Sequence, residues 1–101
     1  MRISFFPSAE VELQDAISYY NSQCEGIGFE FAAEIQQTIE RIISHPEAWT
    51  KLSTYCHRCR AKRFPYSVIY YTENDILFIV SIMHMKRKPN SWRMCLPSHK
   101  Q

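Results

Sequence analysis

The hydrophobic period of this chain changes near its middle, and this change limits the possible folds more than any other feature. Between residues 8 and 45, apolar residues recur at the spacing of amphipathic helices. Between residues 56 and 84, they alternate with polar residues or form β-branched and aromatic runs, as strands do. A block of helices followed by a block of strands indicates an α+β domain, in which a helical layer covers a sheet.

Two amphipathic helices are predicted in the first half. The first begins at Ser8, whose side chain is placed to cap it, and its apolar residues are Ala9, Leu13, Ala16, Ile17 and Tyr20. Gly26 and Gly28 interrupt this pattern. The apolar residues of the second helix are Phe31, Ile35, Ile39, Ile42 and Ile43. This helix must end by His45, because Pro46 disfavours helical geometry in the residue before it. The pair forms an αα-hairpin.

Residues 2–6 and three later segments are predicted strands. In CHRCRAKRF, alternation places Cys59 and Ala61 on one face and three cations, Arg58, Arg60 and Lys62, on the other. YSVIYYT and ILFIVSIMHM form a hairpin around a turn at residues 73–75. Strict alternation in the last strand gives one face to Phe78, Val80, Ile82 and His84. The opposite face then holds Leu77, Ile79, Ser81 and Met83.

The predicted order is therefore β-α-α-β-β-β, with the helical hairpin on one sheet face. No linker divides the chain, so we expect residues 1–101 to form a single domain with a loose C-terminal tail at residues 94–101. The sequence has neither a secretory segment nor a run of about 18 apolar residues, so we expect a soluble, cytoplasmic protein without a membrane partner. In that compartment the cysteines, Cys24, Cys56, Cys59 and Cys95, stay reduced.

Charge is divided unevenly between the two halves. Residues 1–50 contain two cations and eight acids, a net charge of −6, whereas residues 51–101 contain ten cations and two acids, a net charge of +8. This division predicts an acidic helical layer and a basic surface on the sheet face or edge left uncovered, directed at an anionic partner.

Several motifs occur in an order that resembles the RelE/ParE toxin superfamily. They are the Tyr19-Tyr20 pair, GIGFEFAAEI, ISHPEAW, RCRAKRFPYSVIYY and IVSIMHMKRKPNSWR, and together they span residue 2 to Arg93. The similarity is closest to the ParE-like plasmid stabilisation branch. It implies the toxin of a bacterial type II toxin–antitoxin system, two helices against a curved antiparallel sheet, and a cognate antitoxin that holds the toxin inactive. It implies no cofactor.

Members of this superfamily have two kinds of target. RelE-like toxins cleave mRNA on the ribosome, and ParE-like toxins inhibit DNA gyrase. RNA cleavage needs an acid/base and cations around the phosphate, for which His84, Arg60 and Arg87 are the catalytic candidates. RelE-like sites resemble one another in using a Tyr after the last strand, and this chain has no Tyr beyond Tyr71. The prediction is therefore poisoning of gyrase or another essential target, and the alternative is a metal-independent mRNA endoribonuclease.

Other residues are candidates for contact with the target or with nucleic acid: Arg58, Lys62, Arg63, Lys86, Trp92 and Arg93. His84 and Trp92 also have structural interpretations, as a hydrogen-bonded strand residue and as a cap on the core edge. Cys56-x-x-Cys59 with Cys95 and His99 has spacing that permits zinc, but the resembled family is not metal-dependent, so we expect no metal. The antitoxin is expected to be an acidic segment that folds on contact and lies along an apolar groove.

Overall fold

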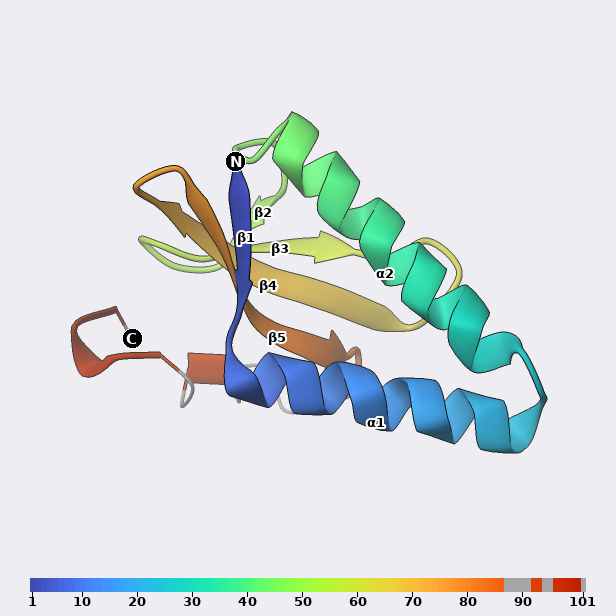
Figure 1. Ribbon diagram of the computed structural model, residues 1–101. Coiled ribbons are helices and arrows are strands. Elements are labelled where there is room, and N and C mark those ends of the chain that lie inside the picture. The colour runs from blue at the N-terminus through green and yellow to red at the C-terminus, as the bar shows by residue number, and fades with distance from the viewer. Residues whose placement is uncertain (87–91, 94–95, 101) are drawn as a thin grey trace.

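The structure, a computed structural model, describes residues 1–86, 92–93 and 96–100 (Figure 1). Its elements are β1 (Arg2–Phe5), α1 (Pro7–Gln23), α2 (Ile27–Ser44), β2 (Thr50–Lys51), β3 (His57–Arg60), β4 (Tyr66–Glu73), β5 (Ile76–His84) and a 3₁₀ turn at Ser98–Lys100. The two helices form a hairpin over one face of the sheet, which confirms the α+β fold and its layer order. None of the helices in these residues has the length and apolar composition needed to cross a membrane.

The sheet is mixed, not purely antiparallel as the family resemblance implied. Its strand order is β1-β5-β4-β3-β2. Strands β2 to β5 pair antiparallel, but β1 pairs parallel with β5, from Arg2 opposite Ile76 to Phe5 opposite Ile79. Parallel neighbours need a long crossover connection, and here the helical hairpin and three strands supply it. Strand β2 has only two residues, which is too short for a periodic signal in the sequence.

The helix boundaries agree with the sequence except at the first cap. Helix α1 begins at Pro7 with Phe6 as N-cap and no side-chain cap, so the prediction that Ser8 caps it was wrong. Proline suits the first helical position, because its missing N–H would have no partner there. Helix α2 ends at Ser44 with His45 as C-cap, as predicted from Pro46.

The two helices approach closely at Gly28. A Cβ added there would overlap the carbonyl oxygen of Ile17 and lie 2.6 Å from Cγ of Asn21. The backbone N–H of Gly28 also donates a hydrogen bond to Oδ1 of Asn21 at 2.8 Å. A side chain at this position would therefore separate α1 from α2.

The predicted hairpin between β4 and β5 is present, but its register contains a bulge. Asn74 and Asp75 form the turn, with φ of 53° and 61°, the left-handed conformation that such two-residue turns need. Ile69 pairs with Ser81 and Tyr70 with Ile79, so Val80 is an extra residue in β5.

The bulge changes which face the end of β5 presents. Leu77, Ile79 and Ile82 all belong to the core under the helices, whereas Val80 and Met83 belong to the core on the other side. The strict alternation predicted for this strand was therefore wrong beyond Val80, because one inserted residue moves every later side chain to the opposite face.

Hydrophobic cores lie on both faces of the sheet. Under the helices, on what we call the helix face, the buried sheet residues are Cys59, Val68, Tyr70, Leu77, Ile79 and Ile82. On the opposite face, which we call the far face, the buried cluster is Cys56, Ile69, Tyr71, Val80, Met83, Trp92 and Leu96. The far face is therefore covered in part by the C-terminal segment, where the sequence had predicted an uncovered surface. Of the predicted tail, residues 94, 95 and 101 lie outside the described residues, and Leu96 and Lys100 are buried.

Candidate functional site

One predicted target-contacting cation, Arg58, and one catalytic candidate, Arg60, lie on the far face of β3. Cys59 packs into the helix-face core, so its neighbours Arg58 and Arg60 point to the far face, opposite Ile69 and Ser67. Arg60 is exposed and Arg58 is half-buried. The alternation predicted for residues 58–61 is confirmed, but β3 ends at Arg60, so Lys62 does not extend this row.

The far face also holds Trp92 and Arg93. Trp92 is 2% exposed and belongs to the far-face core. This burial agrees with the interpretation of Trp92 as a cap on the core edge and leaves little of its ring exposed for contact with a target. Arg93 lies over this ring, with 4.7 Å from its Cζ to the ring centroid. Burial raises the pKa of the Cys56 thiol, and a hydrogen bond with Ser53 and the charges of Arg93 and Lys100 oppose that effect. Cys56 and Trp92 belong to the same buried cluster, so Arg93 lies near the start of β3.

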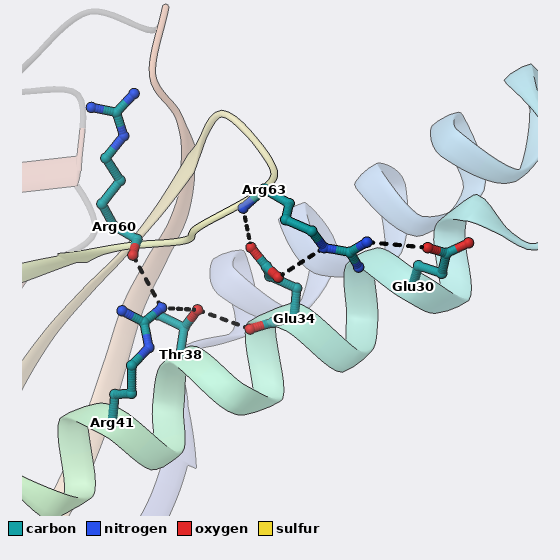
Figure 2. A network of polar contacts seen from close by, with 6 residues as sticks. All are labelled: Glu30, Glu34, Thr38, Arg41, Arg60 and Arg63. Atoms are coloured by element: carbon teal, nitrogen blue, oxygen red, sulfur yellow. Dashed lines mark hydrogen bonds and ion pairs between the residues drawn. The ribbon is translucent and has the colours of Figure 1, made fainter.

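Arg63 lies on the other side of the molecule, against α2 (Figure 2). Lys62 lines a cavity beside the same helix. The backbone N–H of Arg63 donates to Oε2 of Glu34, and its Nε lies 3.4 Å from Oε1 of the same carboxylate. Its Nη1 lies 3.4 Å from Oε1 of Glu30. Burial alone would raise the pKa of Glu34, but hydrogen bonds from Arg63 and from the backbone of Lys62 outweigh it and lower that pKa. Arg63 thus connects the helical hairpin to the β3–β4 loop.

His84 ends β5 on the helix face. It pairs with Tyr66, and the two rings meet edge to face at 5.0 Å between centroids. Its Nδ1 accepts a hydrogen bond from the backbone N–H of Lys86 at 3.0 Å, which orients the ring. Tyr66 packs against the helix-face core, so the side chains of His84 and Arg60 point to opposite faces of the sheet. The third catalytic candidate, Arg87, lies outside the described residues.

The model of a family described as the ParE toxin of the type II toxin–antitoxin system, parDE, matches residues 3–89. The chain belongs to this family. Its resemblance to the RelE/ParE superfamily and its identity as a ParE-like type II toxin are thereby confirmed.

A solved structure supports the fold of this ParE-family chain. It is that of the chromosomal ParDE toxin–antitoxin system from P. aeruginosa, with a TM-score of 0.74 and 12% sequence identity, over 85% of this chain and 97% of that chain. At such low identity the likeness shows the fold alone. Among curated proteins, none matches this sequence.

The ParE-family chain also has an apolar groove that sequence reasoning did not locate. A cavity of about 560 Å³ lies between β1, α1 and α2, and its apolar lining includes Ile3, Phe5, Leu13, Ile35, Ile39 and Ile43. Ile3 is 47% exposed, and β1 is an edge strand of the sheet. Helical spacing predicted the apolar faces that hold Leu13, Ile35 and Ile39, but only the tertiary structure brings these faces beside β1 to form a groove.

The cysteines of the ParE-family chain do not form a metal-binding group in the part that is described. Cys56 belongs to the far-face core and Cys59 to the helix-face core, so the two thiols lie on opposite sides of the sheet. Cys95 lies outside the described residues. Within those residues, no three His, Cys, Asp or Glu side chains are close enough to share an ion.

Proposed function

We propose that this ParE-family toxin acts in the bacterial cytoplasm by poisoning DNA gyrase or another essential target, and that a cognate antitoxin holds it inactive. The match of the ParE toxin model to residues 3–89 carries the proposal. Arg58 and Arg60 on the far face, with Arg93 nearby, supply a positive surface suited to an anionic region of the target.

The separation of His84 from Arg60 supports inhibition over RNA cleavage. Attack by a ribose 2′-hydroxyl needs a proton acceptor and cations at the same phosphate. In this chain the strand register directs the two side chains to opposite faces of the sheet. We therefore assign Arg58 and Arg60 to target binding and give His84 a structural role beside Tyr66.

We propose that the apolar groove is the binding site of the antitoxin. An extended or helical segment that places apolar side chains over Ile3, Phe5 and Ile39 would remove exposed apolar area from water. The free edge of β1 offers backbone hydrogen bonds to an extended segment beside the same groove. Acidic residues elsewhere on the antitoxin would then reach the far-face cations.

One observation favours the alternative, a ribosome-dependent mRNA endoribonuclease. The hydrogen bond from the backbone N–H of Lys86 orients the His84 ring at the end of β5, and a proton-transfer residue must be held in a fixed orientation. His84 and Arg60 point to opposite sheet faces, so RNA on the ribosome would have to wrap around the end of β5 to contact both side chains during cleavage.

Expression in a bacterium separates these functions. A gyrase poison arrests growth, leaves mRNA intact and produces cleaved gyrase–DNA complexes. A nuclease produces new mRNA ends only when ribosomes are present, and His84→Ala abolishes them. Growth arrest with neither product would point to another essential target, and no growth arrest at all would contradict the proposal.

Coexpression tests the antitoxin. The product of the adjacent gene is expected to copurify with this chain, and Ile3→Asp in the groove is expected to release it. Glu10→Gln on the exposed side of α1 serves as the control and should leave the complex intact. Independent elution of the two native proteins would contradict pairing.

A further inference from the structure

A second cavity, of about 530 Å³, lies between the C-terminal half of α2, Trp49 and Lys62. The proposed toxin function gives this cavity no role, and it is separate from the apolar groove. Its lining combines two cations, Arg41 and Lys62, with the indole ring of Trp49, whereas the groove is apolar. Its size falls within the range of small-ligand sites.

Hydrogen bonds hold Arg41 in this cavity, and some of its N–H donors have no acceptor among the residues that the structure describes. Its Nη2 donates to Oγ1 of Thr38 at 3.1 Å and to the carbonyl oxygen of Arg60 at 3.2 Å (Figure 2). The guanidinium also lies against the Trp49 ring, 5.6 Å from Cζ to the centroid. A guanidinium has five N–H donors, and in the described residues those on Nε and Nη1 have no hydrogen-bond partner. The group is therefore fixed in place before any ligand binds.

Trp49 contributes a donor that lacks an acceptor. Its Nε1 is buried and has no hydrogen-bond partner among the described residues, although Trp49 lines the cavity. Buried donors in folded proteins are almost always paired. An acceptor that entered beside Trp49, with a small shift of the ring, would correct this deficit.

The charges around the cavity favour a ligand with a single negative charge. Glu34 lines it, but hydrogen bonds from Arg63 and the backbone of Lys62 already occupy this carboxylate. When the charge of Glu34 is counted as neutralised by Arg63, the other charged lining residues, Arg41, Lys62 and Glu40, give a net charge of +1, and His45 also lines the cavity. Lys62 is exposed and has no ion pair with a described residue.

We propose that this cavity binds a carboxylate group, carried either by a small free acid or by an Asp or Glu side chain of a peptide. Arg41 and Lys62 supply the positive charges, and the indole of Trp49 supplies a neutral donor. A monoanion balances the net charge, whereas a phosphate dianion would exceed it. The inference does not depend on the toxin function, since it concerns the purified chain alone.

The test is a nuclear magnetic resonance titration of the purified chain. The indole N–H signal of Trp49, assigned with Trp49→Phe, is followed as butyrate or N-acetyl-glutamate N-methylamide is added. Both probes are expected to move this signal downfield, and N-acetyl-glutamine N-methylamide, which lacks the charge, is expected to leave it in place. A stronger response to the glutamate derivative identifies a peptide side chain as the better source, and a stronger response to butyrate identifies a free acid.

Lysine variants decide whether the binding is specific to the cavity. Lys62→Gln is expected to weaken binding about fivefold, the value of one exposed charge pair. Lys51→Gln, which removes an exposed lysine of β2, is the matched control and is expected to leave the affinity unchanged. An unmoved Trp49 signal, equal losses in the two variants, or tighter binding of inorganic phosphate than of butyrate would overturn the proposal.

Discussion

Nζ of Lys100 lies 2.6 Å from Oε2 of Glu73, and this ion pair attaches the end of the chain to the last residue of β4. The ammonium also lies 4.4 Å and 5.2 Å from the ring centroids of Tyr55 and Tyr71. The hydrogen bond with Glu73 raises the pKa of Lys100, so the amine stays charged at neutral pH. Together with Leu96, Lys100 holds the described C-terminal residues against the far face.

Loss of this ion pair should loosen the C-terminal segment without unfolding the domain. Lys100→Gln is expected to speed amide exchange in residues 96–100 and in Tyr71, and to leave exchange in α2 unchanged, because local opening exposes only the far face. Hydrogen exchange read by mass spectrometry measures this, with Lys86→Gln as a control at an exposed lysine. The double variant Glu73→Lys with Lys100→Glu should restore slow exchange only in part, because a carboxylate at position 100 is not attracted to the rings of Tyr55 and Tyr71. Equal exchange in Lys100→Gln and the native chain would show that Leu96 alone holds the segment.

The buried carboxylate of Glu34 should make stability depend on pH. Its pKa in the folded chain is lowered below the ordinary value of 4.5, so its contribution is full above that value and is lost as pH falls through the folded pKa. Glu34→Gln is expected to lower the free energy of unfolding by roughly 1–3 kcal/mol at pH 7, because backbone donors of residues 62 and 63 lose a charged acceptor.

Urea denaturation of the native chain and Glu34→Gln from pH 3 to pH 7 measures the difference between them. The difference should shrink towards acid pH. Glu40→Gln, an exposed carboxylate on the same helix, is the control and should have little effect at any pH. A difference that stays constant with pH would mean that packing, not ionisation, determines the contribution of Glu34.

The close contact of the helices at Gly28 should not tolerate a methyl group. Gly28→Ala is expected to lower the free energy of unfolding by about 3 kcal/mol, because its Cβ would push against Ile17 and Asn21. Gly26→Ala is the informative comparison, since a Cβ there meets open space and only its φ of 90° is unfavourable, at about 1–2 kcal/mol. Thermal unfolding of both variants shows which substitution lowers the free energy of unfolding more. A smaller decrease for Gly28→Ala than for Gly26→Ala would contradict the described helix contact.

Removal of the far-face cations should reduce toxicity. Arg58→Gln combined with Arg60→Gln is expected to relieve growth arrest, since each charge-assisted contact to a target is worth about tenfold in affinity. His84→Ala should remain toxic if the target is gyrase, and Lys51→Gln controls for general loss of positive charge. Colony counts after induction give the result, with circular dichroism to confirm that each variant is folded. Full toxicity of the double variant would place the target-binding surface elsewhere.

The sequence by itself determined the elements of this fold except β2, and the side on which most core residues lie. Helical spacing located Phe31, Ile35 and Ile42, and Pro46 located the end of α2. Alternation located Cys59 and Ala61, and Asn74-Asp75 located the hairpin turn. These features depend on residues a few positions apart, so local patterns are enough to predict them.

Only the tertiary structure decided how distant segments meet. The parallel pairing of β1 with β5, the bulge at Val80 and the burial of Trp92 depend on contacts between segments far apart in the chain. The pairing of Arg63 with Glu34 spans 29 positions, and no periodic pattern connects such residues. The separation of Arg60 from His84 follows in turn from strand register, which is fixed by packing of the whole sheet and cannot be deduced from either segment alone.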